Sequence, residues 1–202
     1  MSVLHVSASS KAIQRVRVDL LAVGFYEDER PLRGRAGQVD WRLCGALSRL
    51  IRAGRTRGAR GDAVLMPAGD GLFAARVLAL GLGPVARCDQ AARRDAIVDA
   101  LVRATALRVR SLAVPFEFAG ASPDDERGLD ALLEAVDEGW QAGGRAAGDG
   151  KLVLLGRPGH GETLLAALRA RARTAPPGLR ILSSDGPGDG SPAGLRGLSA
   201  GA

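Results

Sequence analysis

The segment from Asp62 to Pro84 constrains the fold of this chain more than any other stretch. It contains two apolar runs of strand length, 63–66 and 74–80, separated by a short turn of Pro, Ala, Gly and Asp residues. Runs of this length bounded by turn residues predict two consecutive strands joined by a tight turn. The second run ends at Gly81 and Gly83, where the missing side chains let the backbone bend and let another backbone or a ligand approach closely.

The rest of the chain alternates apolar runs of strand length with helical patterns. Asp40, Asp89 and Ser122 are suited to cap helix starts. This alternation predicts an α/β sandwich with a mostly parallel or mixed sheet. Beyond the central pair, strands are expected at 16–25, 110–116 and 151–155, and helices at 40–54, after Asp89, from Ser122 and at 162–173.

The length of 202 residues suits one domain with extensions. Residues 1–15 are expected to form an N-terminal extension, 16–182 the domain, and 183–202 a flexible tail rich in Gly, Pro and Ser. The short segment 179–182 is expected to add an edge strand. The N-terminus lacks the pattern of a signal peptide, and no run approaches the ~20 apolar residues of a membrane span, so a cytoplasmic protein without membrane contact is expected.

The charge is +6, from 28 basic and 22 acidic residues, and all but two of the basic residues are arginine. The composition of the genome explains this bias more simply than a binding role does. One basic cluster between Asp40 and Asp62 is nevertheless a candidate nucleic-acid site. A solvated surface is the preferred interpretation, because no aromatic residue is interleaved to stack on bases. The cluster consists of Arg49, Arg52, Arg55, Arg57 and Arg60.

No catalytic constellation emerges from the motifs. The loop from Gly156 to Thr163 has the spacing of the phosphate-binding pattern GxxxxGK[ST], but Glu162 stands in the lysine position and would repel phosphates. His160 and Glu162 alone do not make a closed metal site, and Cys44 and Cys88 are isolated. The sequence therefore predicts no cofactor, no metal and no catalytic residue.

Four segments, taken together, resemble a known domain. The quoted residues are VDLLAVGFYED (18–28), VDWRLCGALSRLIRAGRTRG (39–58), GDAVLMP (61–67) and ARVLALGLGP (75–84). They are similar to the N-terminal, non-catalytic domain of the cytosolic leucyl aminopeptidases. The resemblance implies an α/β/α sandwich similar to macro domains.

In that family the domain precedes a separate metallopeptidase domain with two divalent metals and the signature NTDAEGR, which this sequence lacks. The resemblance therefore implies a stand-alone, catalytically silent relative and no enzyme. Because the domain contributes to hexamer assembly in the family, assembly or regulation is the leading hypothesis. The expected partner is a second copy or another protein, such as a full-length aminopeptidase. DNA binding by some bacterial members keeps nucleic acid as a weaker possibility.

The alternative is a module that binds a small ligand, nucleotide or ADP-ribose-like, by analogy with macro domains. Loops at the ends of neighbouring strands converge on a crevice in sheets of this kind. A helix that starts near Glu162 would offer backbone amides to a phosphate. The candidate ligand-binding residues are Gly81, Gly83, Glu117, Gly120, Gly156, Gly159, His160 and Gly161.

Overall fold

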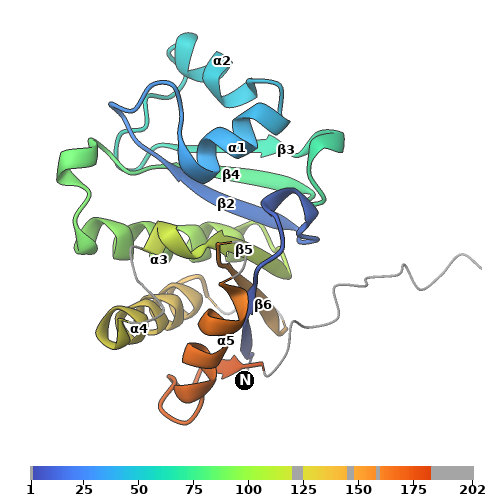
Figure 1. Ribbon diagram of the computed structural model, residues 1–202, viewed down its shortest axis with the longest axis vertical. Coiled ribbons are helices and arrows are strands. Elements are labelled where there is room, and N and C mark those ends of the chain that lie inside the picture. The colour runs from blue at the N-terminus through green and yellow to red at the C-terminus, as the bar shows by residue number, and fades with distance from the viewer. Residues whose placement is uncertain (1, 120–124, 145–147, 158–159, 183–202) are drawn as a thin grey trace, which may run out of the picture.

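A sheet of seven strands forms the middle layer of the fold, in the order β3-β4-β2-β5-β6-β1-β7 (Figure 1). The computed structural model describes residues 2–119, 125–144, 148–157 and 160–182. Neighbouring strands are parallel except β3 and β4, which are antiparallel. The mixed, mostly parallel sheet is therefore confirmed. The strands are β1 (Leu4–Ser9), β2 (Leu20–Phe25), β3 (Ala63–Pro67), β4 (Arg76–Gly81), β5 (Ser111–Pro115), β6 (Gly150–Leu155) and β7 (Leu179–Ile181).

Helices cover both faces of the sheet. Successive side chains of a strand point to opposite faces, so apolar side chains of the same strand are buried under helices on each side. Leu20 and Ala22 of β2 belong to one buried apolar cluster, and Leu21 and Val23 belong to the other. The three-layer sandwich is thus confirmed. The first cluster includes residues of α3 (Gln90–Ala106), α4 (Glu126–Ala142) and α5 (Gly161–Ala170), and the second includes residues of α1 (Gly34–Arg42), α2 (Ala46–Arg52) and the 3-10 turn η1 (Ile13–Arg15).

Residues 4–9, expected to lie in an N-terminal extension, form strand β1 inside the sheet. This strand pairs in parallel with β6 on one side and with β7 on the other. Leu4, Val6 and Ala8 are at most 2% exposed. The alternation of apolar and polar residues in this segment is a strand pattern that the expected extension did not take into account, and pairing along both edges buries the strand. The expected tail, 183–202, lies outside the described residues, whereas the expected edge strand is confirmed as β7.

The segment expected to form one helix from Asp40 to Gly54 instead contains the end of α1, which begins earlier at Gly34, and the whole of α2. The break lies at Cys44 and Gly45, whose φ angles are 52° and 77°. Glycine adopts this left-handed conformation without a steric penalty and commonly ends helices. Asp40 does not cap a helix: its carboxylate accepts hydrogen bonds from the amide and hydroxyl of Ser48, at 3.1 and 2.5 Å, and joins α1 to α2.

The two strands expected within 62–84 are confirmed as the antiparallel pair β3 and β4, with the 3-10 turn η2 (Gly69–Gly71) between them. At the end of β4, the chain passes close to another backbone segment. A Cβ atom on Gly81 would lie 2.0 Å from the carbonyl oxygen of Ala59. The amide of Gly83 donates to the carbonyl of Gly58 at 2.8 Å. Glycine is required at Gly81 because backbone occupies the space of a side chain.

Two helix starts follow the capping chemistry of the sequence. The Asp89 carboxylate accepts from the amide of Ala92 at 2.8 Å and caps α3, as predicted. The Asp125 carboxylate accepts from the amide of Gly128 at 3.0 Å and caps α4, while the expected start at Ser122 lies outside the described residues. Within the described ranges, no helix is both long and apolar enough to cross a membrane.

Candidate ligand-binding crevice

The carboxyl ends of β1, β2, β4, β5 and β6 lie along one edge of the sheet, because these strands are parallel. The chain leaves β2 toward α1 on one face and leaves the neighbouring strand β5 toward α4 on the other. A reversal of this kind opens a crevice beside the strand ends. Two cavities of about 930 and about 180 Å³ lie here and share the lining residues Gly34, Arg35 and Glu117.

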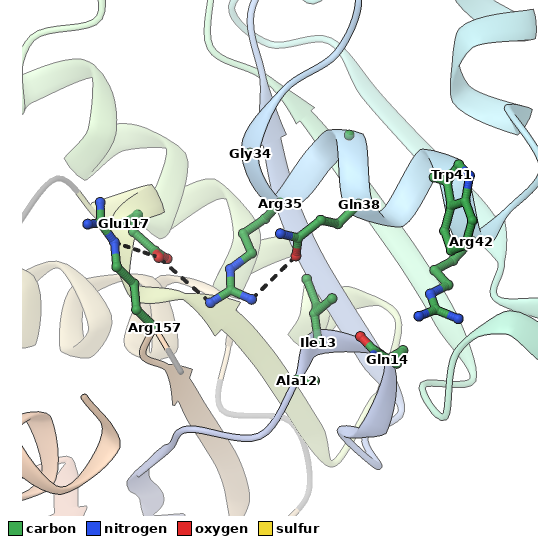
Figure 2. A pocket seen from close by; sticks show the side chains of 11 residues that line it. Ala12, Ile13, Gln14, Gly34, Arg35, Gln38, Trp41, Arg42, Glu117 and Arg157 are labelled. Carbon is green, nitrogen blue, oxygen red and sulfur yellow. Dashed lines mark hydrogen bonds and ion pairs between the residues drawn. The ribbon is translucent and has the colours of Figure 1, made fainter. Parts of the chain in front are cut away.

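Glu117 lies between these cavities, in the 3-10 turn η4 (Phe116–Ala119) that follows β5 (Figure 2). Its Oε1 atom is 3.7 Å from Nη2 of Arg35 and 3.4 Å from Nε of Arg157. Its Oε2 atom is buried and accepts no hydrogen bond from any residue that the structure describes. The carboxylate is therefore attracted by two arginines but leaves part of its hydrogen-bonding capacity unused.

The two arginines beside Glu117 differ in how firmly they are held. Arg35 projects from α1, its side chain is 14% exposed, and its Nη2 atom donates to the carbonyl of Gly156 at 2.9 Å. Arg157 follows β6 and its side chain is 75% exposed. The crevice thus contains one cation in a fixed position and one that is free to adapt to a ligand.

A second pair of polar side chains lies beside the smaller cavity. Arg93 of α3 donates to the hydroxyl of Tyr26 at 3.1 Å and to the carbonyl of Glu117 at 3.5 Å. Burial raises the pKa of the Tyr26 hydroxyl above its ordinary value, and the neighbouring Arg93 opposes the rise. The hydroxyl of Tyr26 therefore stays protonated at neutral pH and remains a hydrogen-bond donor.

The inner end of the crevice is filled by apolar side chains. Phe118 and Leu82 pack on Gly24 near the end of β2, where an added Cβ atom would lie 2.5 Å from the Phe118 ring and 2.7 Å from the Leu82 side chain. This packing leaves the smaller cavity of about 180 Å³. Most of the open volume therefore lies on the α1 side, between α1 and η1.

The charge around the two cavities is strongly unbalanced. Their lining contains five arginines and two glutamates, and arginine forks match the geometry of phosphate and carboxylate oxygens. Among the described residues, no group of three His, Cys, Asp or Glu side chains is placed to hold a metal ion. The arrangement suits an oxyanion. The charged lining residues are Arg33, Arg35, Arg42, Arg93, Arg157, Glu29 and Glu117.

Several of the predicted ligand-binding residues are brought to this edge. Glu117 lines both cavities, and the Gly156 carbonyl binds Arg35 beside the larger one. His160 directly precedes α5, and Gly161 begins that helix packed against Ser10. A role for these residues in ligand binding stays a prediction.

The other predicted ligand-binding residues lie elsewhere. Gly81 and Gly83 pack against residues 58–60 and line neither cavity. Gly81 is thus in close contact with backbone atoms, and Gly83 with the Arg60 side chain. This geometry does not support a role for the two glycines in ligand binding. Gly120 and Gly159 lie outside the described residues.

The arginines proposed for nucleic-acid binding lie on α2 and the segment after it, and all five are exposed. The Arg49 side chain donates to the carbonyl of Cys44, and the Arg60 side chain donates to the carbonyl of Arg87. Their role in nucleic-acid binding stays a prediction. The full set is Arg49, Arg52, Arg55, Arg57 and Arg60.

Sequence reasoning missed the side chains that give the crevice its charge. Tyr26, Arg35, Arg93 and Arg157 come from four separate parts of the chain, and only the order of strands in the sheet brings them together. Local signals existed for three arginines. Arg33 and Arg35 follow a strand that was expected from the sequence, and Arg157 lies in the glycine-rich loop from Gly156 to Thr163 that follows another.

The sequence matches the family model described as the cytosol aminopeptidase family, N-terminal domain, over residues 22–140. A probable cytosol aminopeptidase of Burkholderia multivorans is 36% identical over 118 residues, which are 58% of this chain and 23% of that protein. Another, of Nitrosococcus oceani, is 40% identical over 79 residues, 39% of this chain and 15% of that protein. The matched segment spans less than a quarter of these relatives.

Solved structures with the same fold include an aminopeptidase and several macro domains. A tomato leucine aminopeptidase mutant aligns with a TM-score of 0.57 and 21% identity over 83% of this chain and 36% of that one. The macro domain of ganglioside induced differentiation associated protein 2 aligns with a TM-score of 0.60 and 13% identity, over 81% and 82% of the chains. An Oceanobacillus iheyensis macrodomain with ADP aligns with a TM-score of 0.58 and 8% identity, over 81% and 90%. The fold is macro-domain-like, and the chain belongs to the cytosol aminopeptidase family through its N-terminal domain.

Proposed function

We propose that the chain binds a small phosphate-bearing ligand, nucleotide or ADP-ribose-like, in the arginine-lined crevice. The observation that carries this proposal is the convergence of five arginines around two adjoining cavities at the carboxyl edge of the parallel strands, three of them lining the cavity of about 930 Å³. Arginine binds phosphate oxygens through paired, charge-assisted hydrogen bonds. Further support comes from the similar fold of the macrodomain that was solved with ADP.

The crevice residues have distinct parts in this proposal. Arg35 is fixed by its bond to the Gly156 carbonyl and presents a stationary positive charge. Arg157 is exposed and 3.4 Å from Glu117, so a ligand phosphate would replace the Glu117 carboxylate as its partner. Tyr26 offers a hydroxyl from the neighbouring smaller cavity. Only the N-terminal domain of the aminopeptidases matches this chain. The proposed function of the chain is therefore to bind the ligand and not to catalyse a reaction.

Isothermal titration calorimetry with ADP-ribose, ADP and inorganic pyrophosphate tests the proposal. Arg157→Ala should weaken binding about tenfold, since a hydrogen bond between charged groups contributes roughly 1.5–3 kcal/mol. Arg169→Ala removes an exposed arginine of α5 that lines neither cavity and is the matched control. Absence of binding by all three ligands at millimolar concentration would contradict the proposal.

A role in protein assembly or regulation is the second candidate function. It is favoured by two large aromatic side chains on the surface, Trp41 at 72% and Phe73 at 55% exposure. Exposed aromatics are enriched where proteins bind one another. Light scattering on the purified protein, alone and mixed with a full-length cytosol aminopeptidase, tests this role. A single-chain mass at every concentration, with no complex, would contradict it.

A further inference from the structure

Two exposed aromatic side chains on the α1 side of the sheet each lie beneath an arginine. The Cζ atom of Arg42 is 4.9 Å from the centroid of the Trp41 ring, and the Cζ atom of Arg17 is 4.8 Å from that of Phe73. Stacking on a ring fixes the guanidinium plane and leaves its N–H groups around the rim available to other partners. Each pair therefore combines an apolar ring with a positioned donor of hydrogen bonds.

The two pairs belong to one continuous surface. The amide of Phe73 donates to the carbonyl of Gln14 at 3.0 Å, and Gln14 lines the same cavity as Trp41 and Arg42. Gly71 lies against the Arg42 backbone, where an added Cβ atom would be 2.4 Å from the Arg42 carbonyl oxygen. We name the surface formed by Arg17, Trp41, Arg42 and Phe73 the arginine–aromatic surface.

A groove runs along this surface. Figure 2 shows α1 as one wall, with Gln38 and Trp41, and η1 as the other, with Ile13 and Gln14. A second hollow of about 600 Å³ lies beside Trp41 and extends toward Leu32. The lining of both is mostly apolar. Trp41 therefore stands between two hollows that are wide enough for side chains of a bound segment.

Positive side chains outnumber negative ones in and around the groove. Arg35, Arg42 and Arg157 line its two hollows together with Glu117 and Asp40, and Glu117 already pairs with Arg35 and Arg157. Residues 11–17 and 33–42 contain six basic residues and one acidic residue, Asp40. Asp40 is 8% exposed and bonded to Ser48, so it does not offset the charge at the surface. An acidic partner is thus the complementary one. The six basic residues are Lys11, Arg15, Arg17, Arg33, Arg35 and Arg42.

We propose that the arginine–aromatic surface docks a short acidic segment of a partner protein. Carboxylates of the segment bind the guanidinium rims of Arg17 and Arg42, and an apolar side chain between them fills the groove beside Trp41. A peptide fits better than a single-stranded nucleic acid, because one face of each ring is already covered by a guanidinium and the groove is mostly apolar. This inference rests on the second candidate function. The groove is part of the cavity of about 930 Å³ that also contains the crevice residues Arg35, Glu117 and Arg157.

Fluorescence anisotropy tests the proposal with a short labelled peptide of aspartate and glutamate around a central phenylalanine. The acidic peptide should bind, more weakly as salt rises, and its lysine counterpart should not. Trp41→Ala and Arg42→Ala should each weaken binding about tenfold or more, as expected of aromatic and arginine anchors. Leu65→Ala, at a 44% exposed position of β3, and Arg169→Ala are matched controls and should leave binding unchanged.

A second readout comes from tryptophan fluorescence, because Trp41 is 72% and Trp140 only 5% exposed. The bound peptide should protect Trp41 from quenching by acrylamide. Binding of labelled oligothymidine as tightly as the acidic peptide would overturn the proposal in favour of nucleic acid. Failure of the acidic peptide to bind, or binding that survives Trp41→Ala, would overturn it too. Because the two sites share one cavity, variants at its opposite sides separate them (Figure 2). Arg157→Ala should weaken the binding of ADP-ribose, and Trp41→Ala should not.

Discussion

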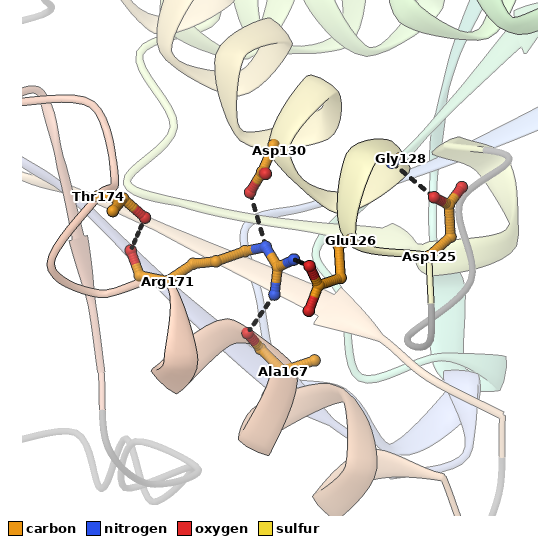
Figure 3. Close-up of polar contacts among 7 residues, drawn as sticks. All are labelled: Asp125, Glu126, Gly128, Asp130, Ala167, Arg171 and Thr174. Carbon is orange, nitrogen blue, oxygen red and sulfur yellow. Dashed lines mark hydrogen bonds and ion pairs between the residues drawn. The ribbon is translucent and has the colours of Figure 1, made fainter.

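Arg171 donates from Nε to the Asp130 carboxylate at 2.6 Å and ties the end of α5 to α4 (Figure 3). Its Nη1 atom donates to the carbonyl of Ala167 at 3.4 Å, and its Nη2 atom lies 3.8 Å from the Glu126 carboxylate. The Arg171 side chain is 12% exposed. The contact holds together two helices that follow β5 and β6, and Glu117 and Arg157 lie in the segments directly after these two strands.

Replacing Arg171 by alanine should lower the free energy of unfolding by about 1–2 kcal/mol, because the largely covered side chain loses packing as well as its hydrogen bonds. Glu126→Ala is the control, and a loss below about 0.5 kcal/mol is expected since that carboxylate is exposed and distant from its partner. Urea unfolding measures both. Equal losses in the two variants would show that packing of Arg171 contributes little.

Gly81→Ala should destabilise the fold by about 1–3 kcal/mol or more, because the new methyl group meets the backbone of residues 58–59, which cannot move aside as a flexible side chain would. Gly156→Ala is the matched change at another strand end. Its Cβ atom would make only ordinary contacts at 3.6–3.7 Å, so the stability should hardly change. Thermal and urea unfolding of the two variants compare the positions. A stable Gly81→Ala protein would contradict the close packing at the end of β4.

Asp62 makes stability depend on pH. The pKa of its carboxyl is held below the ordinary value mainly by a hydrogen bond from the amide of Arg57. The hydroxyl of Thr56 and the amide of Gly58 also donate to the carboxylate and lower the pKa further. A lowered folded-state pKa stabilises the protein above the unfolded pKa, about 3.9, and this stability is lost as the pH falls through the folded pKa.

Asp62→Ala should therefore be about 1 kcal/mol less stable than the natural protein at pH 7, a modest value because the carboxylate is partly solvated. The difference should shrink toward about pH 3. Urea unfolding at several pH values measures it, with Asp70→Ala, at an exposed position of η2, as the control. A difference that stays constant with pH would show that the carboxylate charge is not the cause.

Glu117→Gln should strengthen the binding of ADP-ribose or pyrophosphate. The carboxylate competes with an anionic ligand for Arg35 and Arg157, and the isosteric amide removes that charge while Arg35 keeps its bond to the Gly156 carbonyl. The affinity should rise about two- to fivefold, which corresponds to the free energy that a partly exposed ion pair contributes. Titration calorimetry at constant ionic strength gives the ratio. Weaker binding by the variant would mean that Glu117 is needed to position the arginines.

The local elements were predictable where one stretch of sequence carries its own signal. The hairpin β3–β4 and the cap of α3 at Asp89 follow from turn residues and capping chemistry. Strand β1 also carried a local signal in its alternating apolar and polar residues, but the segment was expected to form an extension. Only the structure shows its position between β6 and β7. The prediction of a single helix from Asp40 was wrong, because the left-handed conformation of Gly45 separates α1 from α2.

The family resemblance of the central segments identified the macro-domain-like fold from the sequence alone. The match of the family model over residues 22–140 confirms that resemblance. The sequence also placed Glu117 and Gly156 at strand ends, because apolar periodicity is a local property. Only the tertiary structure gathered Arg35, Arg93 and Arg157 around Glu117, and only it stacked Arg17 on Phe73. These residues meet through the order of strands in the sheet, which brings together positions that no local pattern relates.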